Sequence, residues 1–191
     1  MQRVLLIGEV HGTKESSKYI KKIIEAESNK KIIICLEVLP RLKQDIIRFI
    51  KTETITNKKL KWYFDSGYLN PSSAGVLRYA IQHRALLACV CYVKTDDAQY
   101  AKNLLSVINK YKKRIIILIA GRYHLRDGSE ICMLLKSKNV RFERIFLSPT
   151  AGNFFNYGVR NIRELDRFTT REPAKIIKIG KTSPSYYDKF I

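Results

Sequence analysis

Two short segments of the sequence place a histidine three residues after a glycine. They are Gly8-Glu9-Val10-His11 and Gly121-Arg122-Tyr123-His124, and they lie 113 residues apart. Imidazole nitrogens bind divalent transition ions, and they also accept and donate protons near neutral pH. The repeated pattern therefore indicates a metal site or an acid–base site.

Two glutamates complete this candidate site. Glu9 lies two residues before His11, and Glu37 directly follows an apolar run that ends at Leu36. Two imidazoles and a carboxylate form a common ligand set for a divalent ion, which lowers the pKa of a bound water and polarises a carbonyl group. His11 and His124, together with Glu37, Glu9 or both, are therefore candidate ligands of a divalent ion such as Mn, Co or Zn. Whichever of Glu9 and Glu37 does not bind the ion is a candidate general base in catalysis.

The segment around His124 also carries residues suited to binding a substrate or a cofactor. Arg122 and Arg126 flank the histidine and are candidates for binding an anionic group of a substrate. Tyr123 is a candidate cofactor-binding residue, and the aromatic cluster at 154–157 is a candidate for lining a pocket. Hydrophobic packing explains the aromatic residues equally well. The two arginines have an alternative explanation too, because a chain this basic has an arginine near most positions.

Apolar runs of strand length alternate with segments of helical period along the chain. The strand-like runs are 3–7, 31–36, 85–93, 114–120 and 140–147, with a possible edge strand at 174–179. The helical segments are 15–27, the stretch from Pro40 to residue 50, the stretches that follow Ser73 and Asp96, and 129–138. Residues 52–71 are polar and Lys-rich, and we interpret them as a connection over the top edge of the sheet.

This alternation predicts an α/β fold with a mainly parallel sheet of about five or six strands and helices on both faces. Ligands of such sheets bind beyond the carboxyl ends of the strands. A parallel sheet therefore brings both Gly-x-x-His segments and Glu37 to one rim. The third histidine, His83, lies between a helix and a strand at the opposite end of the sheet, and we expect it to have a structural role.

Polar residues at the predicted helix starts are candidate N-caps. Thr13 precedes the first helix, and Ser72 or Ser73 precedes the third. We interpret Asp96 and Asp97 as a cap pair rather than as metal ligands.

Length and composition favour one self-sufficient domain. The chain has 191 residues, of which 46% are hydrophobic, so it can bury a core without disulfides or a structural metal. Its four cysteines lack the spacing of zinc sites, and no apolar run approaches the ~18 residues of a membrane span. The Gly-x-x-His segments also lack the glycine patterns of nucleotide-phosphate loops. We expect a single cytoplasmic domain over residues 1–191.

The chain is strongly basic. It has 36 Lys and Arg against 17 Asp and Glu, which gives a formal net charge of +19. Such an excess suits a nucleic-acid partner, yet the sequence has no helix-turn-helix, zinc-finger or ribonucleoprotein-type motif. A solvated basic surface is the alternative interpretation, and the sequence leaves the oligomeric state open.

Three segments resemble the haem-binding uptake and Tiki-like superfamily in its ChaN-like branch, which is related to TraB/Tiki and erythromycin-esterase-like proteins. Leu6 to Thr13 is similar to the opening motif of this group, and Cys35 to Arg41 is similar to its second-strand motif. Ile119 to Gly128 resembles its late "AGxxH…G" motif. The resemblance covers about residues 4–147 and leaves 148–191 as a C-terminal extension.

The resemblance implies a metal-dependent hydrolase that acts on a peptide, amide or ester bond. In Tiki/TraB-like proteins two Gly-x-x-His motifs and a glutamate are implicated in metal-dependent peptide hydrolysis. This marks His11, His124 and Glu37 as the metal or catalytic set, with Glu9 in support. The substrate would be a small molecule or a peptide, and an anionic one suits the flanking arginines. ChaN itself resembles a haem-binding lipoprotein. The resemblance therefore also implies an alternative to the hydrolase, namely a haem- or tetrapyrrole-binding protein without catalysis.

Overall fold

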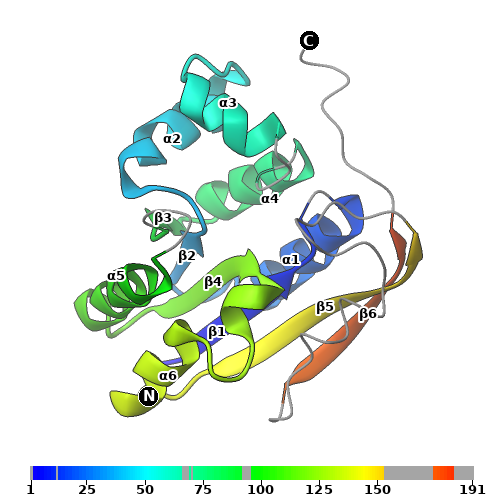
Figure 1. Ribbon diagram of the computed structural model, residues 1–191. Helices are drawn as coiled ribbons and strands as arrows, with labels where there is room; N and C mark the ends of the chain where they lie inside the picture. The colour runs from blue at the N-terminus through cyan, green and yellow to red at the C-terminus, as the bar shows by residue number, and fades with distance from the viewer. Residues whose placement is uncertain are drawn as a thin grey trace.

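Six strands form one sheet in which every neighbouring pair is parallel (Figure 1). The computed structural model describes residues 2–11, 13–65, 69, 71–91, 96–152 and 174–182. The strands are β1 (Val4–Glu9), β2 (Ile32–Leu36), β3 (Leu86–Cys89), β4 (Ile115–Gly121), β5 (Glu143–Gly152) and β6 (Lys175–Thr182). Their order in the sheet is β3-β2-β4-β1-β5-β6, which places β1 and β4 at the centre.

Helices cover both faces of this sheet (Figure 1). One face carries α1 (Lys14–Ala26), α2 (Lys43–Thr52), α3 (Lys58–Asp65) and α4 (Pro71–Gln82). The other face carries α5 (Asp97–Lys110) and α6 (Glu130–Ser137). Two short 3₁₀ turns, η1 (Pro40–Leu42) and η2 (Arg122–Leu125), follow β2 and β4.

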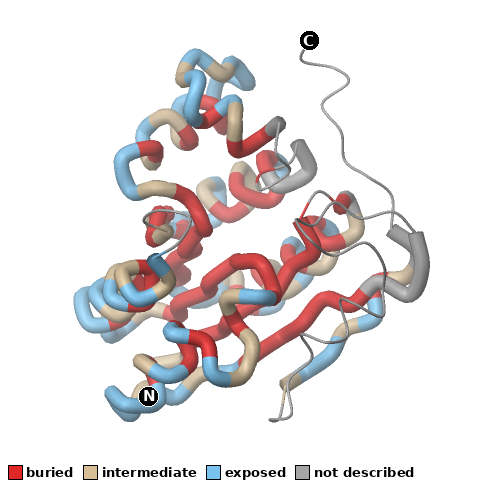
Figure 2. The backbone as a smooth tube through the Cα atoms, in the orientation of Figure 1, coloured by how far each residue is buried: buried red, intermediate tan, exposed pale blue. Residues whose placement is uncertain are grey.

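The continuous apolar strands supply two separate cores, because successive side chains of a strand point to opposite faces. In β1, Leu5 and Ile7 pack with α1–α4, whereas Val4 and Leu6 pack with α5 and α6. The tube in Figure 2 is accordingly buried along β1, β4 and β5 and more exposed along the edge strand β6. The predicted α/β class with helices on both faces is confirmed.

Most predicted strands agree with the observed ones to within a few residues. The possible edge strand at 174–179 is confirmed as β6, which pairs with β5 at the border of the sheet. The predicted strand 85–93 is shorter, because β3 ends at Cys89. The fifth strand is shifted toward the C-terminus: it was expected at 140–147 and spans Glu143–Gly152.

The interpretation of residues 52–71 as a connection is wrong, because this stretch contains α3. Leu60, Tyr63 and Phe64 recur at helical spacing and are buried, and the Phe64 ring lies 4.6 Å from the Phe49 ring of α2 between centroids. The side-chain oxygen of Asn57 accepts hydrogen bonds at the start of the helix, the shorter one from the Lys59 amide at 2.9 Å. The surrounding lysines point to solvent and mask this apolar face in the sequence.

The predicted helix caps have mixed outcomes. Asp96 caps α5, because its carboxylate accepts from the amide of Gln99 at 2.8 Å. Thr13 occupies the N-cap position of α1, but its hydroxyl donates to the carbonyl of Val10 at 2.9 Å and accepts no cap hydrogen bond from the helix backbone. The serine caps predicted for α4 are wrong, since this helix begins at Pro71, a residue that favours the first helical position.

Candidate functional site

Five side chains form a line of alternating carboxylates and imidazoles at the carboxyl ends of the strands. Glu9 Oε1 lies 3.1 Å from His11 Nδ1, and His11 Nε2 lies 3.7 Å from Glu37 Oε2. Glu37 Oε1 lies 3.1 Å from His124 Nε2, and His124 Nδ1 lies 2.9 Å from Asp97 Oδ1. Each imidazole therefore lies between two carboxylates, and both Nε2 atoms face Glu37. The line is most buried at Glu9 and becomes more exposed toward Asp97, whose side chain is 30% accessible.

The parallel topology explains why residues so distant in sequence meet here. Glu9 is the last residue of β1, and Glu37 directly follows β2. His124 lies in η2 immediately after β4, which pairs with both β1 and β2. All these strand ends face the same rim, so the expected convergence of His11, Glu37 and His124 is present in the structure.

The glycine of the second Gly-x-x-His segment is needed for space rather than for an unusual turn. Gly121 has φ −58°, a conformation open to any residue. A Cβ at this position would lie 2.7 Å from His11 Nε2 and 3.6 Å from Glu37 Oε2. The glycine of one segment thus makes room for the histidine of the other. Its amide also donates to Glu37 Oε2 at 2.7 Å, which fixes the carboxylate.

The glycine of the first segment has a similar steric role on the opposite face. A Cβ on Gly8 would lie 2.5 Å from the Phe146 ring and 3.1 Å from Arg122 Cγ. The Arg122 guanidinium carbon lies 5.3 Å from the centre of the same ring, in a cation–π geometry. Both glycines therefore allow close packing beneath the site.

Asp97 is the member of the site that sequence reasoning missed. The pair Asp96-Asp97 matched a helix cap, and Asp96 alone fulfils that role. Asp97 is the first residue of α5 and contacts His124 instead. Its position after β3, at the same rim as the other candidates, is the sequence feature that could have identified it.

The carboxylates favour the protonated form of both histidines. Burial alone would lower the pKa of His124, but contacts with Asp97 and Glu37 outweigh it and raise that pKa to about 10. Burial likewise opposes the charge on His11, and its contact with Glu9 together with the charge of Glu37 leaves the pKa raised. The clustered carboxylates therefore make both imidazoles hold a proton more tightly than a free histidine does.

Glu37 is held as a carboxylate at the centre of this line. Its burial favours the neutral acid, yet contact with His124, the charge of His11 and the amide of Gly121 leave its pKa lowered. An ionised, buried carboxylate between two imidazoles is well suited to binding a cation.

The turn that carries His124 is anchored by a buried arginine. Arg144 of β5 donates to Asp127 Oδ1 at 2.6 Å and to the carbonyl of Leu125 at 3.3 Å. The thiol of Cys132 also donates to the Leu125 carbonyl at 3.5 Å. These contacts fix the chain on the C-terminal side of His124 and so position its ring.

A buried tyrosine beside the site has an unsatisfied hydroxyl. Tyr100 of α5 is 1% exposed, and its ring lies 5.7 Å from that of His124 between centroids. Within the described part of the chain, its hydroxyl makes no hydrogen bond. Leaving such a group unpaired costs about 1–3 kcal/mol, so this hydroxyl marks a place where a bound ligand would find a donor.

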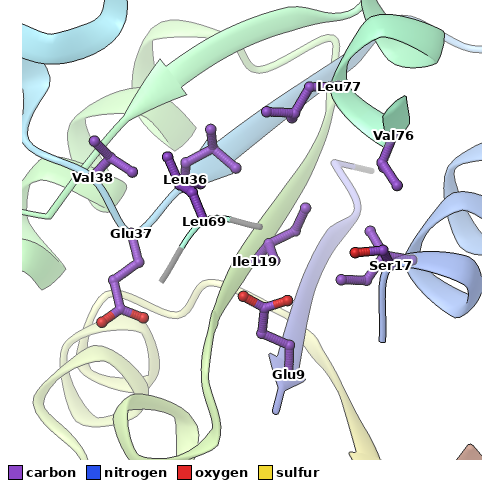
Figure 3. A pocket seen from close by; sticks show the side chains of 10 residues that line it. Glu9, Ser17, Leu36, Glu37, Val38, Leu69, Val76, Leu77 and Ile119 are labelled. Atoms are coloured by element: carbon purple, nitrogen blue, oxygen red, sulfur yellow. The ribbon is translucent and has the colours of Figure 1, made fainter. Parts of the chain in front are cut away.

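A small apolar cavity adjoins the two glutamates (Figure 3). Its walls are mostly aliphatic: Ile20, Leu36, Val38, Leu69, Val76, Leu77 and Ile119, with Ser17 from α1. In Figure 3 the carboxylates of Glu9 and Glu37 lie at one end of these walls. The cavity measures about 20 Å³, which is room for about one water molecule.

The remaining predicted site residues lie around His124. Tyr123 is 47% exposed, and its hydroxyl accepts from Arg126 Nη2 at 2.9 Å while the guanidinium lies over its ring. Arg122 is 1% exposed and packs on Phe146, beneath the rim. Roles of Arg122 and Arg126 in substrate binding, and of Tyr123 in cofactor binding, stay predictions. The aromatic cluster at 154–157 lies outside the described residues.

Three further observations complete the description of the molecule. Among the described residues, no group of three His, Cys, Asp or Glu side chains is arranged so that it could hold a metal ion. His83 lies away from the candidate site, where its ring stacks on Tyr79 and its Nδ1 lies 2.8 Å from the Tyr79 carbonyl. Within the same residues, no helix is long and apolar enough to cross a membrane.

Comparison with solved structures shows the fold. No protein-family profile matches the sequence, and no curated protein is significantly similar to it. The type III effector HopBA1 superposes with a TM-score of 0.56 at 11% identity, over 94% of this chain and 88% of the effector. A protein from Bacillus cereus gives 0.53 at 10% identity, over 97% and 90% of the two chains. Haem-bound ChaN of Campylobacter jejuni is also similar, with a TM-score of 0.46 at 12% identity over 84% of each chain.

Proposed function

We propose that this protein is a metal-dependent hydrolase that acts on a peptide, amide or ester bond. The observation that carries the proposal is that two imidazole Nε2 atoms face one buried carboxylate, while a second carboxylate contacts the Nδ1 atom of each ring. This arrangement recurs around histidine-bound metals, where an outer carboxylate fixes the ring and its tautomer.

The donor set fits a divalent ion. His11, Glu37 and His124 offer two nitrogens and a carboxylate, a combination typical of Mn, Co and Zn sites with open positions. The unpaired hydroxyl of Tyr100 beside His124 is a second indication that a ligand belongs here. When bound, the ion would supply an activated water and polarise the carbonyl of the substrate.

The other side chains have separate tasks in this proposal. Glu9 lies within hydrogen-bond distance of His11 Nδ1, and Asp97 lies within ion-pair distance of His124 Nδ1, so both carboxylates favour a proton on Nδ1 and a free lone pair on Nε2. Glu9 also borders the cavity, where it can accept a proton from a water molecule. The Tyr100 hydroxyl is a donor for an oxygen that gains negative charge during the reaction.

The surroundings suggest which substrates the site prefers. The aliphatic cavity beside Glu9 and Glu37 suits a small apolar substituent next to the reacting bond. Arg126 at the rim suits an anionic group on the exposed side of the substrate.

Metal binding and hydrolysis test the proposal together. Titration with Mn²⁺, Co²⁺ or Zn²⁺ should show one tight site per chain, and a screen of peptide, amide and ester substrates should show metal-dependent turnover. His11→Gln and His124→Gln should each abolish both. His83→Gln is the matched control, since it changes the remaining histidine outside the site. Absence of a stoichiometric site, or activity that survives both site variants, would contradict the proposal.

Haem binding is a second candidate with one specific observation in its favour. Tyr123 is an exposed phenol beside His124, and a cationic Arg126 donates to its oxygen. A tyrosine oxygen is one of the ligands that proteins offer to haem iron. Haemin titration should then give a saturable Soret shift that Tyr123→Phe removes, and a shift that persists in this variant would contradict it.

A further inference from the structure

Basic residues gather at the amino ends of the strands, whereas the candidate site lies at their carboxyl ends. Each strand from β1 to β5 has a lysine or arginine within the two residues before it. The register brings these segments together, since the amide of Ile115 donates to the Lys31 carbonyl at 2.9 Å and that of Ile116 donates to the Arg3 carbonyl at 3.0 Å. The exposed members, which we name the basic pole, are Lys30, Lys31, Arg84, Lys112, Lys113, Lys138 and Arg141.

The nearby carboxylates are already neutralised. Glu143 pairs with Arg3, with 2.8 Å between Oε1 and Nε, and Glu27 pairs with the same arginine and with Lys30 at 2.8 Å. Within the described ranges, Lys112 and Arg141 have no carboxylate within ion-pair distance. The basic pole therefore keeps an uncompensated positive charge.

A large cavity opens in the middle of this surface. It measures about 410 Å³ and is bounded by the end of α5, the start of β1 and the segment that leads into β5. Its lining combines two cations with side-chain amides over an apolar floor: Gln2, Val4, Ile108, Asn109, Lys112, Asn139, Val140 and Arg141. The Gln2 side chain joins the start of β1 to the end of α5, because it donates to the carbonyl of Tyr111 at 3.0 Å and to that of Ile108 at 3.2 Å.

Helix dipoles explain only part of the charge. Lys110 and Lys136 lie in the last turns of α5 and α6, where a cation stabilises the helix end. Lys112, Lys113 and Arg141 lie beyond these helices, so the dipole gives no reason for their presence. A cavity that presents cations and amides is instead suited to an anion that carries hydrogen-bonding groups.

We propose that the basic pole binds the phosphate backbone of a nucleic acid, with a phosphate and its sugar seated in this cavity. The phosphates of a nucleic acid are spaced along its backbone, and they match cations that are distributed over the amino ends of several β-strands. A projecting phosphate and sugar fill a concave cavity, whereas a bilayer presents a flat surface. This surface lies at the opposite end of the strands from the candidate site and does not depend on the proposed hydrolase.

Two charge-matched triple variants test this surface. Lys112→Gln, Lys113→Gln and Arg141→Gln alter the basic pole, and Lys51→Gln, Lys58→Gln and Lys59→Gln alter exposed lysines of α2 and α3. Each triple lowers the formal net charge by the same amount, 19 − 3 = +16. Binding of labelled 20-nucleotide DNA and RNA, single- and double-stranded, is measured by anisotropy over a range of KCl concentrations.

The pole variant should lose at least tenfold in affinity, and its salt slope should fall by about 2 to 3, since each phosphate contact contributes about 0.9. The control variant should change less than threefold. Equal losses in the two variants would show that net charge alone is responsible and would overturn the proposal. Binding to vesicles of anionic phospholipid that the pole variant loses, without binding to nucleic acid, would also overturn it. Circular dichroism confirms that each variant is folded.

Discussion

At the scale of single residues, the candidate site depends on which nitrogen of each histidine faces which carboxylate. Both Nδ1 atoms contact an outer carboxylate, Glu9 or Asp97, and both Nε2 atoms face the shared Glu37. The outer carboxylates orient the rings, and the inner one joins them. The sequence predicted four of these five side chains, and Asp97 was interpreted as a cap because its neighbour Asp96 is one.

Asp97→Asn should weaken metal binding about 10- to 100-fold, because the His124 ring loses the carboxylate that fixes its tautomer. Isothermal titration with Zn²⁺ or Co²⁺ measures the change. Asp96→Asn is the matched control at the adjacent position. Asparagine still caps a helix, so this variant should keep both its stability and its metal affinity. Equal effects of the two substitutions would show that Asp97 acts only through the helix.

Metal affinity should rise steeply with pH. His11 and His124 bind a metal ion only when their Nε2 atoms are deprotonated, and their neighbouring carboxylates raise the pKa of His11 and raise that of His124 to about 10. Binding should therefore release protons, measured as a dependence of the titration enthalpy on the ionisation enthalpy of the buffer. A binding enthalpy that is the same in phosphate and Tris would contradict this.

The same pKa shift predicts how pH affects the metal-free protein. The folded state binds the His124 proton more tightly than the unfolded state, because its pKa is raised from 6.5 to about 10. The resulting stabilisation is complete below about pH 6.5 and is lost as the pH rises toward 10. Urea unfolding between pH 6.5 and 9.5 should show a steeper decline in the free energy of unfolding for wild type than for His124→Gln.

At the scale of elements, the strands and their terminal glycines set the geometry of the site. β1, β2 and β4 lie side by side in the sheet, so Glu9 at the end of β1 and the segments that follow these strands meet at one rim, where α5 adds Asp97. Gly121 leaves room for His11, and Gly8 leaves room for Phe146 and Arg122. Close packing between neighbouring strand ends, rather than flexibility of the backbone, is the reason for glycine at both positions.

Gly121→Ala should therefore impair the site more than the fold. Its new methyl would lie 2.7 Å from His11 Nε2, so the ring must move, and we expect at least a tenfold loss of metal affinity. Gly75→Ala is the control, because nothing lies within 4 Å of that Cβ on an exposed helix position. The control should raise the free energy of unfolding by about 0.5–1 kcal/mol and leave metal binding unchanged. An unchanged metal affinity in Gly121→Ala would contradict the geometry described for His11.

At the scale of the whole molecule, the parallel sheet separates two kinds of chemistry. Clustered carboxylates and imidazoles lie at the carboxyl ends of the strands, and the basic pole lies at the amino ends. In the sequence the lysines and arginines are dispersed along the chain, and only the topology shows that those preceding five strands share a surface.

The net charge of +19 should make the folded state sensitive to salt. Like charges repel more strongly in the compact state than in the unfolded chain, and salt screens this repulsion. The Tm should therefore rise between 20 mM and 500 mM KCl, by differential scanning fluorimetry. The rise should be smaller for the triple variant of the basic pole. A Tm that falls with salt would show that ion pairs such as Arg3–Glu27 outweigh the repulsion.

The periodicity of the sequence was enough to predict the fold class and most elements. Strands such as Ile32–Leu36 are continuously apolar because both faces of a parallel sheet are buried, and this pattern is local. The helix α3 was missed because its lysines conceal a face of only three buried side chains. Local pattern is weakest where an element is short and mostly exposed.

What the sequence determined by itself was the α/β class and the two Gly-x-x-His segments with Glu37, because residue type and spacing are local properties. Only the tertiary structure decided that His11 and His124 face the same carboxylate, that Asp97 completes the line, and that Gly121 leaves room for the His11 ring. These contacts join residues at least 26 positions apart, and the bond from the Gly121 amide to Glu37 spans 84 positions. They depend on strand order and register, which follow from how the whole chain packs.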